Sequence, residues 1–230
     1  ASALTGRLTD PRDLGMECPQ IAVPQKFYVN DDLIVTPPDN AGPVFRGPNI
    51  GEPVKRTPLP EVLRVKIAAR VGDKVTTDHI LPSGPVGKYR SNVAKSSEYL
   101  FRDVDPQFLR RCRDHRAEGL ASAIVAGLSY GQGSSREHAA LCPMYVGVRL
   151  VIAKSIERIH MANLANFGIL PLMFEDEKDY DRLENGDELL LAGTARLLES
   201  PVVRIGNVTR GFEFDASHRL TRRQIENMLK

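Results

Sequence analysis

The sequence has few cysteines, and their placement argues against two kinds of site. Cys18, Cys112 and Cys142 are the three cysteines among 230 residues, and no two of them form a C-x-x-C pair. Structural zinc sites and iron–sulfur clusters usually draw at least two ligands from one short loop. Three widely spaced cysteines also give no disulfide framework. We therefore expect three plain thiols in a reducing, intracellular setting, and no metal ligand in this chain.

Long apolar runs and targeting signals are also missing. No stretch approaches the roughly 18 to 20 apolar residues that a membrane-spanning helix needs. The opening "ASALTGRLTDPRDL" lacks the basic-then-apolar pattern of a signal peptide. It lacks an initiator methionine as well, so we expect a trimmed chain or part of a longer polypeptide. These absences predict a cytoplasmic protein with no membrane partner, or a protein of the mitochondrial matrix if the source is eukaryotic.

An excess of charge of one sign is absent too. The chain has 31 basic and 29 acidic residues, for a net charge of +2. This balance argues against a protein whose main task is to grip a phosphate backbone. The densest basic stretch, "FRDVDPQFLRRCRDHR" at residues 101–116, interleaves acids and favours a solvated helix face.

Residues 1–60 differ in composition from the rest of the chain. Residues 35–60 hold seven of the 16 prolines. Proline fixes φ and removes a backbone donor, which excludes a helix or an inner strand there. We predict a Pro-rich connector over 1–60, with a brief strand possible at "KFYVNDDLIV", residues 26–35.

Residues 61–230 have the pattern of a folded α/β domain. Alternation predicts a strand over 61–72, and apolar runs predict parallel strands over 121–128, 148–155 and 169–174, with helices over 134–147 and 156–168 between these three. This order is typical of right-handed βαβ units. Short strands at 187–193, 201–206 and 211–216 follow, and a helix at 221–230 opens with a Thr221–Gln224 capping box. We predict a mostly parallel core sheet with antiparallel margins, flanked by helices.

The stretch "YGQGSSREH", residues 130–138, places unusual chemistry after a buried strand. In α/β sheets, ligands bind beyond the carboxyl ends of the strands. Gly131 and Gly133 allow a sharp turn and a close approach. Ser134 and Ser135 fall in the predicted first helical turn, where N–H groups favour negative charge. Arg136 adds a guanidinium that can hold a carboxylate through two hydrogen bonds, so the stretch predicts an anion receptor.

Other interpretations of this stretch are a helix cap and two known catalytic loops. Ser134 and Glu137 match a capping box, which needs neither the glycines nor Arg136. A phosphate-binding P-loop is excluded because no Lys-Ser/Thr pair follows the glycines. A G-x-S-x-G nucleophile elbow is excluded because no glycine stands two places after either serine.

A second stretch, "TTDHILPSGPVGKYR" at residues 76–90, adds an aspartate, a histidine and a second arginine to the predicted site. Asp78 and His79 precede a Gly/Pro-rich loop, and Arg90 ends it. Taken singly, each of the three is most often a structural residue. Together with the serine loop, Asp78 could orient a serine hydroxyl or accept its proton, and Arg90 could hold a second carboxylate.

These two stretches together resemble the C-terminal, swivelling domain of aconitase, and "ASALTGRLTDPR" resembles the segment that precedes that domain. The serine motif is also similar to the small subunits of isopropylmalate and homoaconitate dehydratases. The resemblance implies a swivelling β/β/α domain and a hydro-lyase that interconverts citrate and isocitrate through cis-aconitate. It implies a [4Fe–4S] cluster in the complete enzyme, with its ligands outside this chain.

The resemblance also implies roles for residues. Ser134 matches the serine that removes the proton, while Asp78 and His79 match the catalytic region beside it. The residues that match ligands of the substrate's carboxylates are Arg90, Ser135 and Arg136. The implied partners are a tricarboxylate and cluster-bearing domains, either in the same longer polypeptide or in a large subunit. This chain alone is expected to be inactive.

Three other functions remain to be separated from this one. The chain could be the small subunit of an isopropylmalate or homoaconitate dehydratase, although its connector is long for that. RNA binding is disfavoured by the balanced charge. A non-catalytic, carboxylate-binding module would show no activity after reconstitution.

Overall fold

The computed structural model describes residues 1–17, 20–37, 42–43 and 45–230. The chain divides into two compact units, Ala1–Phe45 and Arg46–Lys230. The first unit contains the short helix α1 (Ser2–Thr5) and the 3-10 turn η1 (Pro11–Leu14). Across the described residues, no helix is both long and apolar enough to cross a membrane.

The second unit alternates strands and helices through most of its length. The strands are β1 (Val62–Val71), β2 (Ala121–Ala126), β3 (Val148–Ala153), β4 (Leu170–Phe174), β5 (Glu188–Ala192), β6 (Val202–Asn207) and β7 (Phe212–Ser217). The α-helices are α2 (Thr77–Ile80), α3 (Ser83–Val86), α4 (Val93–Ser97), α5 (Phe108–Ala117), α6 (His138–Tyr145), α7 (Arg158–Asn166) and α8 (Arg222–Leu229). The 3-10 turns are η2 (Gly87–Tyr89), η3 (Glu177–Arg182) and η4 (Thr194–Leu198).

The strands form a closed barrel in the order β1-β2-β3-β4-β7-β6-β5. Strands β1 to β4 pair in parallel, and the remaining pairings, including the closing contact of β5 with β1, are antiparallel. The prediction of a sheet with antiparallel margins did not include closure, and the pairing of β5 with β1 closes the sheet into a barrel. Each predicted strand between residues 61 and 216 is present.

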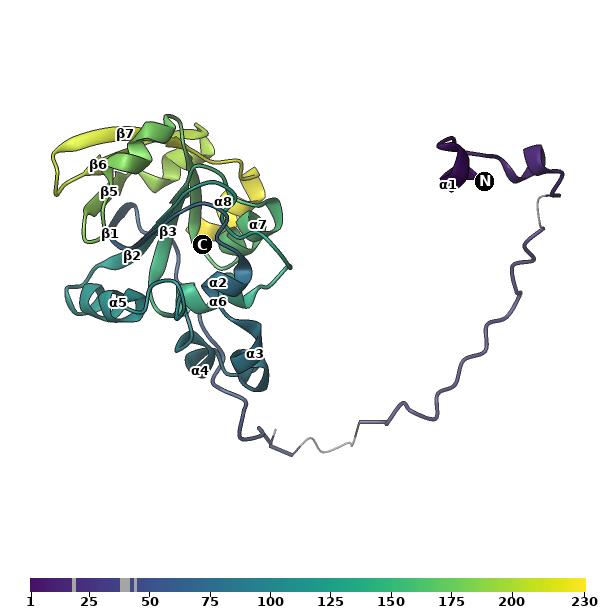
Figure 1. Cartoon of the computed structure of the whole chain (residues 1–230). Coiled ribbons are helices and arrows are strands. Elements are labelled where there is room, and N and C mark those ends of the chain that lie inside the picture. The colour runs from purple at the N-terminus through teal and green to yellow at the C-terminus, as the bar shows by residue number, and fades with distance from the viewer. Residues whose placement is uncertain (18–19, 38–41, 44) are drawn as a thin grey trace. The chain divides into compact units, whose positions relative to one another are not determined.

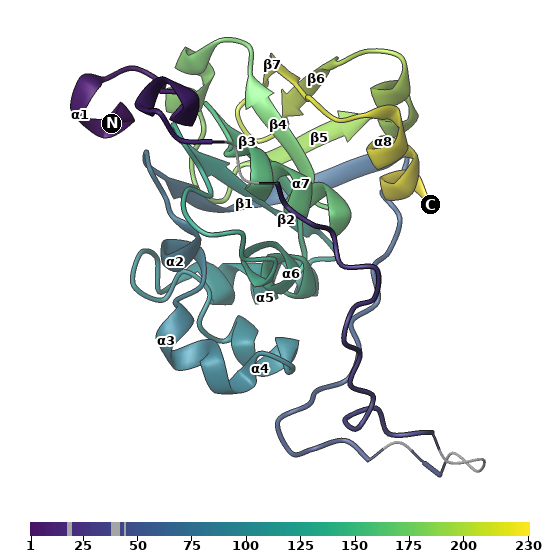
Figure 2. The same cartoon turned by 90° about the vertical axis from the view of Figure 1, so that its right-hand side faces the viewer.

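Two apolar clusters hold the barrel and its helices together. One takes alternate residues from all seven strands, such as Val65, Val125 and Ile152, and we assign it to the inner face because neighbouring strand residues point to opposite faces. The other packs the opposite face of the parallel strands against helices, with Phe101, Phe108 and the α6 residues Ala139, Ala140 and Cys142 fully buried. Figures 1 and 2 show α2 to α6 gathered on one side of the barrel, with β5 to β7 on the other.

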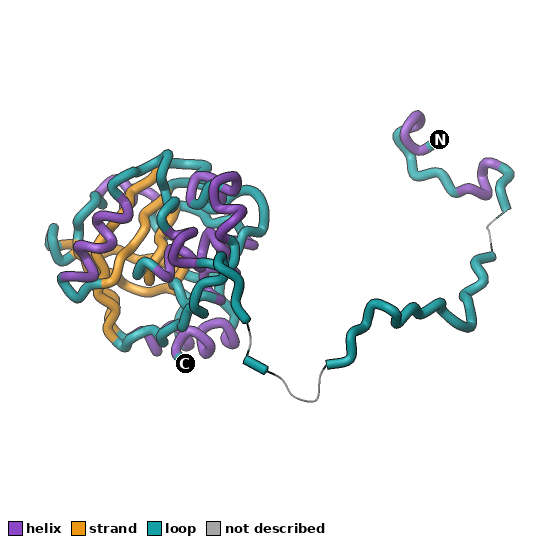
Figure 3. Tube along the Cα trace, turned by 90° about the horizontal axis from the view of Figure 1, so that it is seen from below, coloured by secondary structure: helices purple, strands orange, loops and turns teal. Residues whose placement is uncertain are grey.

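Helices surround the strands when the unit is seen from below (Figure 3). The predicted solvated helix at residues 101–116 is shorter, and one side of α5 is buried through Phe108, Cys112 and His115. Its exposed arginines agree with the predicted solvated face, but its apolar contacts were not predicted.

The boundary between the two compact units falls within residues 1–60, between Phe45 and Arg46. No strand forms within residues 26–35, so that prediction is wrong; the segment has no partner strand among the described residues. Residues 46–60 belong to the second unit, where Leu59 is buried and its N–H donates to Met228 O over 2.8 Å. The buried Arg149 donates to the carbonyls of Thr57 and Pro58, each over 2.8 Å.

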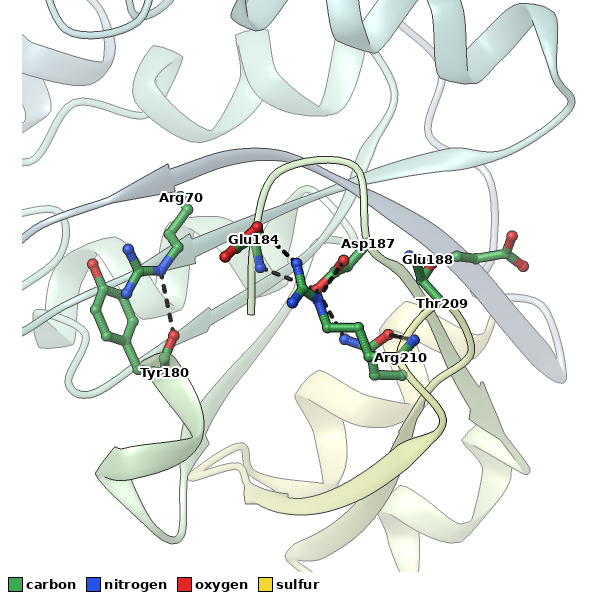
Figure 4. A network of polar contacts seen from close by, with 8 residues as sticks. Arg70, Tyr180, Glu184, Asp187, Glu188, Thr209 and Arg210 are labelled. Atoms are coloured by element: carbon green, nitrogen blue, oxygen red, sulfur yellow. Dashed lines mark hydrogen bonds and ion pairs between the residues drawn. The ribbon is translucent and has the colours of Figure 1, made fainter. Parts of the chain in front are cut away.

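A polar network ties the β5–β6 hairpin to the preceding turn (Figure 4). Asp187 is buried and accepts hydrogen bonds from Asn207 Nδ2 over 3.0 Å and from Arg210 Nε over 2.7 Å. Arg210 also contacts Glu184 over 2.7 Å. The carboxylate of Asp187 thus joins both ends of the hairpin.

Candidate active site

Backbone hydrogen bonds join the two sequence stretches directly. The carboxyl ends of β1, β2 and β3 are aligned, with Val71 opposite Ala126 and Ala126 opposite Ala153. The loops that follow therefore start side by side. Gly131 N donates to Val75 O, and Thr77 N donates to Gln132 O, both over 2.8 Å. These bonds bring the serine loop and the "TTDH" turn together.

The two glycines of the serine loop are required by backbone shape and by space. Gly131 has φ +81° and Gly133 has φ +115°, which side chains rarely adopt. A Cβ on Gly131 would lie 2.2 Å from the ring of His160, and a Cβ on Gly133 would lie 3.2 Å from Thr77 Oγ1. The loop can therefore pack closely on the elements behind it.

Arg136 and Asp78 form a two-armed ion pair across the two loops. Arg136 Nη1 lies 2.5 Å from Asp78 Oδ1, and Nη2 lies 2.9 Å from Oδ2. The guanidinium holds the pKa of Asp78 well below its usual range, so this carboxylate is a poor base. Asp78 also accepts hydrogen bonds from the N–H and hydroxyl of Ser83, over 3.2 and 3.1 Å. This set of contacts suits a residue that orients Arg136 more than one that accepts a proton.

The ion pair leaves part of the Arg136 guanidinium available. A guanidinium has five N–H donors. Asp78 takes one donor from each Nη atom, and Leu81 O lies 3.4 Å from Nη1. The Nε–H and the second Nη2–H form another fork, which has the geometry to hold a second carboxylate.

His79 closes a helix cap in the structure. Its Nδ1 accepts a hydrogen bond from Thr76 N over 3.1 Å, and its own N–H donates to Thr76 Oγ1 over 3.1 Å. The side chain is exposed, and its Nδ1 is occupied by this reciprocal cap. A catalytic use of His79 would therefore involve Nε2.

Arg90 and Arg136 line one cavity of about 440 Å³. Ser135, Ser83 and His138 line the same cavity. The loop carrying Arg90 is held on one side by α6, because His138 Nε2 lies 2.7 Å from Arg90 O. Both predicted carboxylate-binding arginines thus line a shared cavity.

Ser134 lies next to this cavity and is exposed. It lines a smaller hollow of about 190 Å³ together with Arg158 and His160. Asp78 and Ser134 make no hydrogen bond with each other among the described residues. The structure therefore brings together Asp78, Arg90, Ser135 and Arg136, with Ser134 on the neighbouring surface.

The helix after the serine loop starts later than predicted. Helix α6 begins at His138 with Glu137 at its cap position, and no side chain caps it. The alternative interpretation, a Ser134–Glu137 capping box, is not formed, and Ser134 and Ser135 precede the helix. Arg136 N donates to Ser134 O over 2.7 Å in a tight turn, which lets Arg136 point toward Asp78 instead of continuing the helix.

The described cysteines do not fit an iron–sulfur cluster. Cys112 and Cys142 are free and buried, and burial raises the pKa of each thiol to about 11. A cluster needs thiolates, which such thiols do not supply. Within the part of the chain that the structure describes, no three His, Cys, Asp or Glu residues are grouped to hold a metal ion. Cys18 lies outside the described residues.

Two histidines of the site were missed by the sequence analysis. His138 is the last residue of the stretch 130–138 and follows Arg136, which was assigned a role, by two positions. His160 packs against Tyr130 with ring centroids 5.2 Å apart, and no sequence signal distinguishes it from other helix residues. The role of His160 becomes visible in the structure, where the backbone places Gly131 against the His160 ring.

Comparisons with known proteins show which family the chain is similar to. A family model described as the aconitase C-terminal domain matches residues 85–177. A probable mitochondrial aconitate hydratase of Caenorhabditis elegans is 34% identical over 183 residues, covering 70% of this chain and 24% of that protein. The mitochondrial aconitate hydratase of Saccharomyces cerevisiae is 33% identical over 174 residues, covering 66% of this chain and 22% of that protein.

One solved structure resembles the fold as a whole. The 3-isopropylmalate dehydratase (leuD) of Methanocaldococcus jannaschii superposes with a TM-score of 0.54 and 25% identity, covering 70% of this chain and 86% of that one. By contrast, the chain spans about a quarter of the length of the curated relatives it matches, 24% in the worm protein.

Proposed function

Because the chain belongs to the aconitase family, we propose that it supplies the carboxylate-binding and proton-abstracting part of an aconitate hydratase. That enzyme would interconvert citrate and isocitrate through cis-aconitate. A cluster-bearing part outside this chain would complete it, either in the same polypeptide or as a large subunit. The observation that carries the proposal is the cavity shared by Arg90 and Arg136, with Ser135 on its wall and Ser134 exposed beside it.

Binding comes first in the proposed sequence. Arg90 and the free fork of Arg136 each take one carboxylate of a polyacid, since guanidinium and carboxylate match in shape and charge. Asp78 keeps Arg136 oriented through its two-armed pair. Ser135 adds a hydroxyl to the same wall.

Proton removal is assigned to Ser134. An ordinary hydroxyl is too weak an acid to stand as an alkoxide near neutral pH, so its anion needs nearby positive charge and N–H donors. Arg158 lines the same hollow as Ser134, and Arg136 follows two residues later in the loop. Cys112 and Cys142 do not fit a cluster, and neither takes part in the proposed binding or proton removal.

The substitution Ser134→Ala tests the proton-removing role. It should lower kcat of the complete enzyme by about 10² to 10³ or more, the size seen when a key polar group of a reaction centre is lost. The far-UV circular dichroism spectrum and the unfolding midpoint should stay unchanged, because the exposed hydroxyl makes no described structural hydrogen bond.

Ser217→Ala is the matched control, since Ser217 ends β7 and lines neither cavity. It should keep wild-type turnover. Activity of Ser134→Ala within a few-fold of wild type would refute the assignment.

The second candidate function is the small subunit of an isopropylmalate or homoaconitate dehydratase. The leuD structure favours it, because the chain covers 86% of that protein. Arg90 distinguishes the two candidates, since an isopropyl group calls for an apolar contact where a carboxylate calls for a guanidinium. Assays of citrate, isopropylmalate and homoaconitate with the completed enzyme separate them directly.

A further inference from the structure

His138 lines the same cavity as the two arginines of the site, and it does not line the hollow that contains Ser134. It is the first residue of α6 and follows Arg136 by two positions. Its Nε2 lies 2.7 Å from the backbone carbonyl of Arg90. A carbonyl only accepts, so Nε2 must carry the proton and donate it.

This hydrogen bond links two loops that are far apart in the sequence. On one side, Asp78 fixes the guanidinium of Arg136. On the other, His138 fixes the backbone from which Arg90 extends. Both arginines line the cavity of about 440 Å³, and His138 lines it with them.

Further contacts hold the residues on either side of Arg90. Gly51 N donates to Ser91 O over 2.8 Å, and Ser96 Oγ donates to Tyr89 O over 2.8 Å. Among the described residues, the bond from His138 is the one that meets the Arg90 peptide from the side of α6. The Arg90 side chain itself is exposed, so its reach depends on where its backbone is held.

We propose that His138 is a positioning residue that sets the distance between the Arg90 and Arg136 guanidiniums, and so selects substrates with two suitably spaced carboxylates. The inference rests on the proposed function. Without the bond, the Arg90 loop would sample positions from which its guanidinium misses the second carboxylate. Binding would weaken, while the proton-removing group would be unaffected.

The test uses steady-state kinetics of the complete, cluster-loaded enzyme with citrate. His138→Leu keeps a side chain of moderate bulk but removes the donor, and His138→Gln keeps an N–H at a similar reach. Loss of one neutral hydrogen bond should raise KM about tenfold in the leucine variant, with kcat within about twofold of wild type. The glutamine variant should return KM to within about threefold.

A double-mutant cycle with Arg90→Ala separates positioning from general damage. If His138 acts through Arg90, then His138→Leu should raise KM no further once Arg90 is alanine. Additive effects, or equal losses of kcat in the leucine and glutamine variants, would overturn the inference.

The same cycle separates failure of this inference from failure of the proposed function. If Arg90→Ala alone leaves KM for citrate unchanged, the carboxylate role of Arg90 is wrong, and the proposed function with it. If Arg90→Ala raises KM but His138→Leu does not, only the positioning role is wrong.

Discussion

At the scale of single residues, the serine loop packs around two buried rings, those of Tyr130 and His160. The Tyr130 hydroxyl and both ring nitrogens of His160 have no hydrogen-bond partner among the described residues. Burial lowers the pKa of His160 to about 4, so the ring stays neutral near pH 7, and burial raises the pKa of Tyr130 above its usual range. The imidazole therefore gives Gly131 a flat, uncharged surface.

The neutral His160 makes stability fall in acid. Its ordinary pKa is 6.5 and its folded pKa is about 4. As pH falls from 6.5 to 4, the unfolded chain binds a proton that the folded chain resists, so folding is progressively weakened, and the loss is complete below 4. At 1.36 kcal/mol for each pKa unit, the effect is of the order of 3 kcal/mol. Urea unfolding of the chain at pH 7.5, 6, 5 and 4.5 measures it.

His160→Phe is the control for this acid effect. It keeps a ring beneath Gly131 and removes the titrating group, so its free energy of unfolding should vary less between pH 7 and 4.5. His115, whose pKa is also lowered by burial, is present in both proteins and cancels in the comparison. An identical pH dependence in the two proteins would contradict the role of His160.

Residue types indicated where a candidate anion site lies, but they did not indicate its contacts. Two glycines, two serines and an arginine after a buried strand indicated an anion site, because few structural needs call for that set. The pairing of Asp78 with Arg136 joins residues 58 positions apart. Sequence spacing carries no information on such a contact, so Asp78 was linked to Ser134 instead.

At the scale of elements, the β5–β6 hairpin depends on one buried carboxylate. The Asp187 side chain is 4% exposed and holds Asn207, Arg210 and the N–H of Glu184 (Figure 4). Asp187→Ala leaves the buried Asn207 amide without its acceptor, which should lower the free energy of unfolding by about 2 to 3 kcal/mol. Chemical denaturation of the chain measures the change.

Glu213→Ala is a matched comparison on the neighbouring strand. Glu213 is 66% exposed and lies 3.9 Å from Arg204, and such surface pairs contribute little. Its removal should leave the unfolding midpoint unchanged. Equal effects of the two substitutions would show that the Asp187 network is no anchor.

Strand positions could be predicted closely, and helix starts less so. Strands β2 to β4 are short apolar runs ended by polar or glycine residues, which fixed them within about two residues. The start of α6 was misplaced because Ser134-x-x-Glu137 satisfies the local pattern of a cap. The ion pair of Arg136 overrides that local preference. The capping box of Thr221 and Gln224 has no such competitor, and its prediction is confirmed.

At the scale of the whole molecule, the site occupies one end of the barrel and is open to a partner. Ser134, Asp78 and Arg90 are all exposed there. A reaction that removes a proton and expels hydroxide needs groups on more than one side of the substrate. We therefore expect the isolated 230-residue chain to show no turnover of citrate and no stoichiometric iron–sulfur absorbance.

Addition of the cluster-bearing part should restore activity to this chain. The measurement is the absorbance of cis-aconitate with each part alone and with both together. A cluster spectrum in the isolated chain would overturn the assignment of ligands to the missing part. Activity in neither arrangement would favour a carboxylate-binding module without catalysis.

The overall architecture was predicted only as far as local pattern allows. Alternating or continuous apolar runs show that a strand is buried, but they do not tell which strands become neighbours. The closing pair of β1 with β5 joins residues more than 120 positions apart, such as Val62 and Ala192. That contact closes the sheet into a barrel, and no local pattern indicated it.

Closure of the barrel has a consequence for how such a unit can occur in proteins of different length. An open sheet ends in a row of unpaired backbone groups that invites foreign strands to add to it, whereas a ring of strands exposes no such template. A module of this kind tolerates being joined to other polypeptides or separated from them without becoming prone to aggregate. Units similar to this one form part of the longer aconitate hydratases and most of the leuD chain.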